Sequence, residues 1–151
     1  MAIRLDYLAK WLDPLGMSPP QVFELADRPT SDVVKLIRHG LPAKAFGQVA
    51  DTLHITKNAL ARKLGVAQRT VNRKSRERDT LSAETSEKLI RVARVHNRAK
   101  IIFSDDEAIS DWLGKSAPAL GGVAPIDLLD TDLGARDVES LILGIAYGNV
   151  I

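Results

Sequence analysis

Apolar residues recur every three or four positions along most of the chain, which is the period of a helix that buries one face. The segments with this spacing are 31–39, 43–55, 57–64, 83–102, 107–113 and 135–147, and a further helix is expected at 68–76, where Val71 is the only apolar residue. No segment alternates apolar and polar residues as a strand would, and no Asn-Gly or Asp-Gly pair marks a hairpin turn. The pattern therefore predicts an all-α protein.

The first thirty residues are expected to form an N-terminal helical appendage. Their apolar positions predict a short amphipathic helix that ends before Gly16: Ile3, Tyr7, Leu8, Trp11, Leu12 and Leu15. Pro19 and Pro20 follow, and because prolines donate no backbone hydrogen bonds, we expect them to break the chain. Residues 1–30 are therefore expected to be loosely held.

Polar residues with short side chains mark where the later helices should begin. The expected N-caps are Thr30 or Ser31, Thr56, Ser82, and Ser104 or Asp105. Gly40 and Pro42 should end the first of these helices. A connection rich in Pro and Gly at 115–125 then leads to a short helical turn at 125–131 and to the last helix.

The charges are distributed very unevenly, although the net charge is only +2. Residues 1–54 are neutral overall, whereas residues 55–100 hold thirteen Lys and Arg against four Asp and Glu, a net charge of +9. Residues 101–151 hold two Lys and Arg against nine Asp and Glu, a net charge of −7. A basic centre followed by an acidic end indicates two surfaces with different partners. We therefore expect two domains after the appendage, residues 31–103 and residues 104–151.

The composition is that of an ordinary globular protein, with 45% hydrophobic and 26% charged residues. The chain has no cysteine, which rules out disulfides and thiolate chemistry and fits a cytoplasmic protein. No apolar run approaches the roughly 18 residues of a membrane span, so no membrane partner is expected. The N-terminal segment carries charges within its apolar pattern, unlike a secretory signal.

The stretch LGVAQRTVNRKSR, residues 64–76, has the features of a sharp corner between two helices. Gly65 can adopt the left-handed conformation that ends one helix and starts a tight turn, and Ala61 is small where a second helix must cross closely. The apolar residues that would fix the angle are Leu60, Leu64, Val66 and Val71. This spacing predicts a helix-turn-helix unit, which places its second helix in the major groove of DNA.

The exposed face of this second helix carries the side chains expected to contact DNA. Arg forks onto guanine and Gln or Asn pairs with adenine, so the predicted base readers are Gln68, Arg69, Asn72 and Arg73, with Thr70 and Lys74 beside them. Predicted phosphate contacts are Lys74, Arg76, Arg78, Thr56 and Lys57. The alternative is an ordinary solvated helix, which the basic surroundings disfavour. Lys74 departs from the pattern, because an apolar residue is usual near this position. Either the recognition helix packs more weakly at its C-terminal end, or the register of the helix is shifted by one residue.

The acidic end closes with an apolar stripe on one helix face, formed by Val138, Leu141, Ile142 and Ile145, with Leu143 and Tyr147 to its side. Fewer than about 50 residues build little core alone. Some of this apolar surface is therefore expected to pack on the central region, on a second copy or on another protein.

An ordered set of residues marks this end: Trp112-Leu113, ALGGVAPIDLL at 119–129, Gly134, Val138, Leu141 and IAYG at 145–148. In this order they resemble the toxin-binding domain of Xre-type antitoxins, which are encoded with RES-domain toxins in bacterial type II toxin–antitoxin pairs. The basic centre, ALARKLGVAQRTVNRK followed by LSAETSEKLIRVARV, is similar to the DNA-binding region of the same family. The resemblance covers about residues 31–150.

The resemblance implies an α-helical antitoxin that inhibits a RES-type toxin, a class that degrades NAD. It also implies a dimer that represses its own operon, alone or with the toxin. In such complexes the C-terminal region lies against the mouth of the toxin's active site. The expected toxin contacts are therefore Leu141, Ile145, Tyr147, Asn149, Val150 and Ile151.

The acidic charge suits such a partner, because a cleft that holds the pyrophosphate of NAD is expected to be basic. The carboxylates expected to steer the encounter are Asp127, Asp130, Asp132, Asp137 and Glu139. The alternative for each of them is a solvated acidic face.

The sequence does not indicate an enzyme. His39, His54 and His96 do not pair with carboxylates at metal-ligand spacing, and no nucleophile elbow or phosphate-binding loop is present. We therefore expect no cofactor and no metal.

Two alternatives stay open at this point. The first is a stand-alone helix-turn-helix repressor whose C-terminal domain dimerises or binds a small ligand. The second keeps the antitoxin role with a toxin of another fold. Helix 83–102 and the C-terminal helix are both candidates for the dimer surface.

Overall fold

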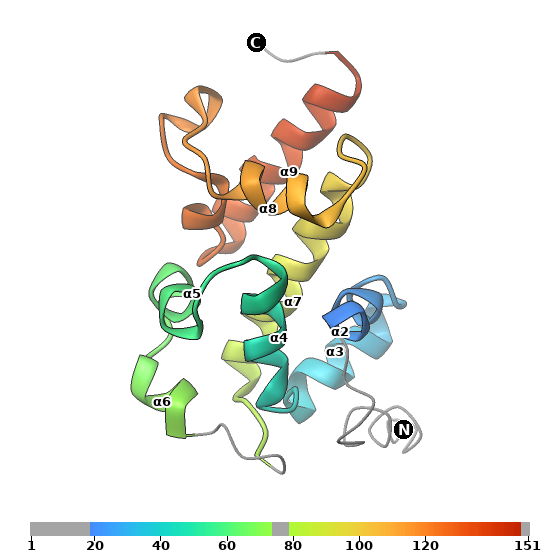
Figure 1. Cartoon of the computed structure of the whole chain (residues 1–151). Helices are drawn as coiled ribbons and strands as arrows, with labels where there is room; N and C mark the ends of the chain where they lie inside the picture. Colours follow the sequence, from blue (N-terminus) through green and yellow to red (C-terminus); the bar gives the residue numbers. More distant parts are fainter. Residues whose placement is uncertain (1–18, 74–78, 149–151) are drawn as a thin grey trace.

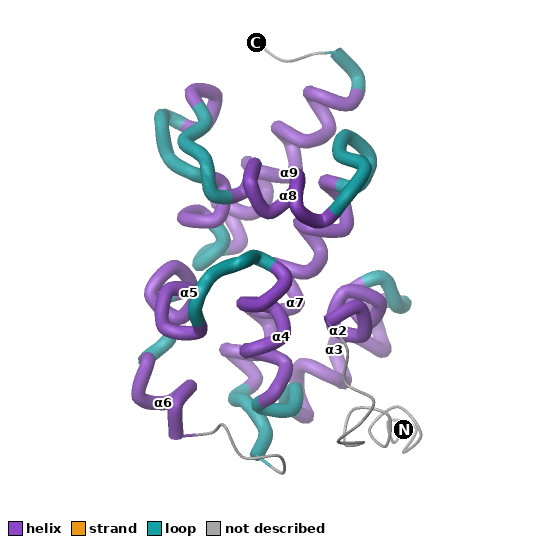
Figure 2. Tube along the Cα trace, viewed as in Figure 1, coloured by secondary structure: helices purple, strands orange, loops and turns teal. Residues whose placement is uncertain are grey.

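The computed structural model describes residues 19–73 and 79–148, and in these ranges all regular structure is helical (Figure 2). The helices before the corner are α2 (Pro19–Ala26), α3 (Thr30–His39) and α4 (Lys44–Thr52). The corner is built from α5 (Lys57–Leu64) and α6 (Gln68–Arg73), and α7 (Ala83–Ala99) follows. The C-terminal part holds α8 (Asp106–Leu113), the 3-10 turns η1 (Pro118–Leu120) and η2 (Pro125–Leu128), and α9 (Asp132–Ala146). The all-α prediction is confirmed.

Helix α7 runs through the middle of the molecule and contacts helices on both sides (Figure 1). It packs against α2, α3 and α4 near the corner and against α9 in the C-terminal part. Its buried face includes Leu89, Val92, Ala93 and Val95. Helices α6 and α9 therefore sit on one framework, with α6 at one end of the molecule and the end of α9 at the other (Figure 1). The division into residues 1–30, 31–103 and 104–151 stays a prediction.

The tandem prolines begin a helix instead of breaking the chain. Pro19 and Pro20 occupy the first turn of α2, where backbone N–H groups have no partner within the helix, so their missing donors cost nothing. Val22, Phe23 and Leu25 of this helix are buried in the core. The described end of the predicted appendage is thus packed against α4 and α7. The helix predicted before Gly16 lies outside the described residues.

Three of the predicted N-caps are confirmed by side chains that accept a backbone N–H. Thr56 accepts from Ala59 at 3.0 Å, Ser82 from Thr85 at 3.1 Å, and the Oδ1 atom of Asp105 from Ala108 at 2.7 Å. The cap predicted for α3 is wrong: Pro29 holds the N-cap position without a side-chain hydrogen bond, and Thr30 and Ser31 belong to the helix.

Several helix boundaries differ from the prediction, and one close approach explains the start of the last helix. Helix α7 ends at Ala99 instead of 102, and α9 begins at Asp132 instead of 135. Thr131 caps α9 by accepting the N–H of Gly134 at 3.0 Å. A methyl group on Gly134 would overlap the carbonyl oxygen of Leu128, so η2 can pack this tightly on α9 only because residue 134 has no side chain.

Candidate functional site

The predicted corner forms as a helix-turn-helix. Gly65 follows α5 in the left-handed conformation with φ of 66°, and the N–H of Val66 donates to the carbonyl oxygen of Ala61 at 2.8 Å. The buried residues that fix the angle are Leu60, Ala61, Leu64 and Val71. Val66 is half-buried against them.

Helix α6 divides its side chains between the core and solvent. Val71 is 4% exposed and anchors the helix, whereas Arg69 and Asn72 are exposed. Gln68 and Thr70 are half-buried, so less of each side chain is available to contact a DNA groove. Arg73 is the last described residue of α6, and Lys74, Arg76 and Arg78 lie outside the described residues. The structure therefore presents two of the predicted readers, Arg69 and Asn72, most openly.

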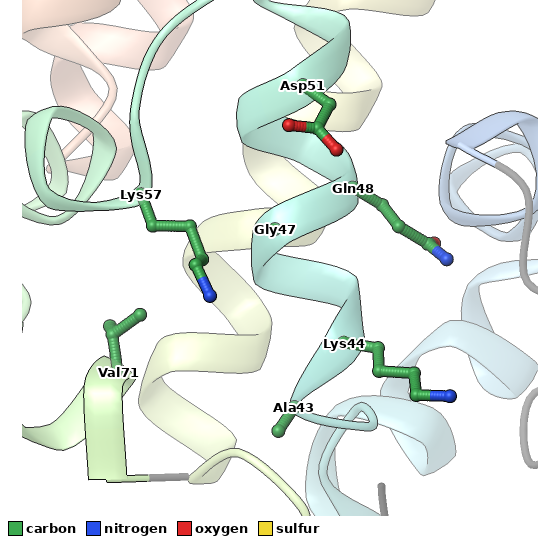
Figure 3. A pocket seen from close by; sticks show the side chains of 7 residues that line it. All are labelled: Ala43, Lys44, Gly47, Gln48, Asp51, Lys57 and Val71. Atoms are coloured by element: carbon green, nitrogen blue, oxygen red, sulfur yellow. The ribbon is translucent and has the colours of Figure 1, made fainter. Parts of the chain in front are cut away.

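Lys57 lies in the first turn of α5 and projects into a pocket of about 270 Å³ between α4 and α6. Figure 3 shows its ammonium pointing between Gly47 and Val71, while Lys44 and Gln48 point to the other side of α4. The Cδ atom of Lys57 lies 3.4 Å from where a Cβ on Gly47 would be, so the lysine side chain passes close beside this glycine. Lys57 thus lies beside Val71 of the recognition helix.

Side chains from distant parts of the sequence hold the corner in place. Lys88 of α7 donates to the carbonyl oxygen of Leu64, the last residue of α5, at 2.8 Å. Lys63 of α5 forms an ion pair with Asp127 of η2, with 2.9 Å between Nζ and Oδ1. Neither contact could be predicted from the sequence, because the partners are 24 and 64 positions apart and no local spacing links them.

The C-terminal half of α9 carries the apolar residues that the core does not cover. Val138 and Ile142 are fully buried, Leu141 is half-buried, and Ile145 is 37% exposed. Tyr147, just after the helix, is 75% exposed. The stripe predicted for this helix is thus buried at one end and open at the other. Asn149, Val150 and Ile151 lie outside the described residues.

Two further apolar residues on α9 are exposed. Leu143 is 36% exposed and lies near Ile145 and Tyr147 along the helix, whereas Leu133 is 75% exposed at the opposite end of α9. Leu143 was predicted to lie beside the stripe without a role of its own, and the exposure of Leu133 was not predicted because this residue lies before the predicted start of the helix.

Three of the five acidic residues expected to steer a partner are bound within the chain. Asp127 pairs with Lys63, Asp132 with Arg136 at 2.9 Å, and Glu139 with Arg94 at 3.0 Å. Asp130 and Asp137 are exposed and make no ion pair among the described residues. The acidic surface that can reach a partner is therefore smaller than the net charge of the segment indicates.

His96 is buried where α7 meets α2 and α8. Its ring lies 4.6 Å from that of Phe23, and its Nε2 lies 3.7 Å from Oδ1 of Asp106. Burial lowers the pKa of His96 below its ordinary value of 6.5, Asp106 opposes this shift, and Lys100 adds to it. The described residues contain no group of three or more His, Cys, Asp or Glu that could hold a metal ion. No helix among them is long and apolar enough to cross a bilayer.

Both halves of the chain match known families. Residues 32–94 match the antitoxin Xre-like helix-turn-helix domain, and residues 98–148 match the antitoxin Xre/MbcA/ParS C-terminal toxin-binding domain. The two matched ranges coincide with the part that holds the corner and with the part that ends in α9. The second match favours an antitoxin over a stand-alone regulator.

Named relatives agree with these matches. The chain is 30% identical over 141 residues to the Prs ADP-ribosylating antitoxin of Sphingobium sp. (strain YBL2), covering 87% of this chain and 89% of the relative. It is 28% identical over 116 residues to the antitoxin Xre of Photorhabdus laumondii subsp. laumondii, covering 76% and 78%. It is 30% identical over 105 residues to the antitoxin Xre of Yersinia enterocolitica, covering 66% and 71%. The chain therefore belongs to the Xre antitoxin family, and it joins a helix-turn-helix domain to a toxin-binding domain.

Proposed function

We propose that this antitoxin neutralises a RES-type toxin that degrades NAD, and that it represses its own operon by binding DNA as a dimer or as a toxin complex. The observation that carries the proposal is the separation of two unlike surfaces on one framework. Polar side chains are exposed on α6 at one end of the molecule, and apolar ones at the end of α9 at the other (Figure 1). A molecule arranged in this way can hold both partners at once.

The name of the Sphingobium relative supports a toxin that uses NAD. The relative is called a Prs ADP-ribosylating antitoxin, and ADP-ribosylation is a reaction in which NAD donates the ADP-ribose group. A toxin that transfers this group and a toxin that hydrolyses NAD both need a cleft for the same dinucleotide. The proposal therefore assigns an NAD-binding cleft to the partner in either case.

Toxin binding is assigned to the end of α9 and to the residues after it. Tyr147 is large, exposed and amphipathic, as are many residues that dominate protein interfaces. Leu141 and Ile145 extend the apolar surface along the helix, and the proposed contacts also include Asn149, Val150 and Ile151, which follow in the sequence. Asp130 and Asp137 supply unpaired negative charge that favours a basic cleft.

DNA binding is assigned to α6 and its surroundings. Arg69 and Asn72 read base edges, and Gln68, Thr70 and Arg73 contribute at shorter range or at the helix end. Lys57, Lys74 and Arg76 contact phosphates, which fix the position of the protein without specifying the sequence. A dimer with this geometry predicts an inverted repeat with half-sites about 34 Å apart, or a multiple of that distance.

Co-expression with the neighbouring gene tests the proposal. That gene product should arrest growth and deplete cellular NAD when expressed alone, and this protein should restore both growth and the NAD pool. A variant with Tyr147→Ala should restore them less well, whereas Arg69→Ala should restore them fully. A neighbouring gene product that leaves growth and NAD unchanged contradicts the proposed partner.

A further inference from the structure

A second site lies away from both proposed interfaces, in a pocket of about 240 Å³ between α2, α4, α7 and α8. This volume is several times the roughly 30 Å³ that one water molecule occupies in the liquid. His96 and Asn97 of α7 line the pocket together with Asp106 of α8, Glu24 of α2 and Asp27, which directly follows α2. The pocket therefore touches helices from both matched domains.

Buried polar atoms without partners are concentrated here. His96 is 1% exposed, and neither of its ring nitrogens has a hydrogen-bond partner among the described residues. Asn97 donates from Nδ2 to the carbonyl oxygen of Phe23 at 2.7 Å, but its buried Oδ1 accepts from no described residue. Of the four such side-chain atoms in the described part of the chain, three belong to His96 and Asn97, two residues that line this pocket. Native proteins rarely leave buried polar atoms unsatisfied, so the pocket is built to receive hydrogen bonds.

The charges around the pocket favour a cation. Glu24, Asp27 and Asp106 contribute three carboxylates, whereas Lys100 contributes one ammonium and forms no ion pair with them. Because burial lowers the pKa of His96, its ring is uncharged at neutral pH and one nitrogen can accept a hydrogen bond. These acceptors do not form a metal-ligand set among the described residues. A ligand with several N–H donors and a positive charge fits this combination.

We propose that this pocket binds the ammonium group of a small organic amine. Its N–H groups donate to Oδ1 of Asn97 and to the unprotonated ring nitrogen of His96, and its charge faces the three carboxylates. The amine group belongs either to a free diamine or to a lysine side chain of another protein. This site goes beyond the proposed antitoxin function, because it involves neither α6 nor the end of α9.

The direct test follows the His96 ring by NMR in the full chain with ¹³C-labelled histidine, titrated with putrescine (1,4-diaminobutane). His39→Gln and His54→Asn, both at exposed positions, assign the other two histidines. We expect a saturable shift of the His96 signal with putrescine and none with 1,4-butanediol, which has the same length but no charge. An unmoved His96 signal, or an equal shift with the diol, overturns the proposal.

A charge-neutralised variant tests the role of the carboxylates. Glu24→Gln, Asp27→Asn and Asp106→Asn together should raise the Kd for putrescine by at least about fivefold. The three changes are combined because each carboxylate is exposed, so its attraction to the ammonium group is weak on its own. Glu107→Gln is the matched control, because it removes an exposed charge from the same turn of α8 outside the pocket. An unchanged Kd in the triple variant places putrescine elsewhere and overturns the site.

A second ligand separates the two sources of the amine. A capped Ala-Lys-Ala peptide that shifts His96 as strongly as putrescine indicates that the pocket takes lysine side chains. A response to putrescine alone indicates a free amine. Both responses support the ammonium site, and no response to either ligand rejects it.

Discussion

The described part of helix α6, Gln68–Arg73, exposes polar side chains, whereas α9 is 15 residues long and exposes apolar side chains at its end. The first is anchored by one buried side chain, Val71, together with the turn at Gly65. The second is anchored by a row of buried residues and leaves Ile145 and Tyr147 uncovered. The polar surface is therefore supported by a local turn and a buried anchor, whereas the apolar surface belongs to a helix whose buried part supports its exposed part.

The two regions also differ in what can damage them. The corner depends on local spacing, a cap and a left-handed glycine, which act within about ten residues. The C-terminal part depends on close packing of η2 against α9, where no room is left for a side chain at Gly134. We therefore expect a core change in the C-terminal part to separate the two activities.

Gly134→Ala should have the largest effect on stability. The added methyl overlaps the carbonyl oxygen of Leu128, so we expect the free energy of unfolding to fall by about 1–3 kcal/mol. Chemical denaturation measures this change. Gly114→Ala is the control, because a Cβ there meets its neighbours at ordinary distances of 3.6 Å or more. Equal stability of the two variants would show that η2 does not pack on α9 as described.

Acidification should weaken the junction between the two regions through His96. Its pKa is lowered in the folded chain, so as pH falls through about 6.5 the unfolded chain takes up the proton before the folded chain does. Stability is therefore fully present above that pH and is lost as pH falls toward the folded pKa.

The melting temperature measured between pH 7.5 and 5 checks this dependence. His96→Leu should show a shallower fall than the parent chain, whereas His54→Asn, which changes an exposed histidine with positive φ, should follow the parent. Parallel curves for His96→Leu and the parent would exclude His96 as the source.

Lys57→Ala should distinguish residues of the corner that contact phosphates from residues that contact base edges. Because a phosphate contact carries no sequence information, binding should weaken about equally on operator and unrelated DNA, and the slope of log K against log salt should fall in magnitude by about 1. Fluorescence anisotropy at several salt concentrations measures both quantities. A loss confined to operator DNA would make Lys57 a base reader instead.

The ion pair between Lys63 and Asp127 should have the smallest effect. Both side chains are partly exposed, at 32% and 42%, so a double-mutant cycle with Ala should give a coupling of about 0.2–1 kcal/mol. Thermal unfolding of the four variants measures this coupling. A larger coupling would mean that the two regions are joined more rigidly than their contacts indicate.

The sequence predicted the corner well because its determinants are local. Thr56, Gly65 and Val71 each act within a few residues, and spacing alone places them correctly. The start of α2 was mispredicted because proline both ends helices and begins them, and only the surrounding packing decides between the two. The cap of α3 failed for a similar reason, since Pro29 takes the position that Thr30 and Ser31 were expected to hold.

Contacts between distant segments could not be predicted from spacing. The pairing of Asp127 with Lys63 and of Glu139 with Arg94 depends on how η2 and α9 dock on α5 and α7. This pairing removes charge that the sequence assigned to a partner. For the same reason the exposure of Leu143 and Tyr147 emerged only from the fold, although the resemblance to Xre-type antitoxins had already placed Tyr147 at an interface.

The central claim is that DNA and toxin are bound by separate ends of one molecule, and affinities of two variants for both partners test it most directly. Arg69→Ala should weaken operator binding by about 1–3 kcal/mol and leave the Kd for the toxin unchanged. Tyr147→Ala should weaken toxin binding by about 2 kcal/mol or more and leave operator binding by the free antitoxin unchanged. Comparable losses for both partners in both variants would contradict the separation.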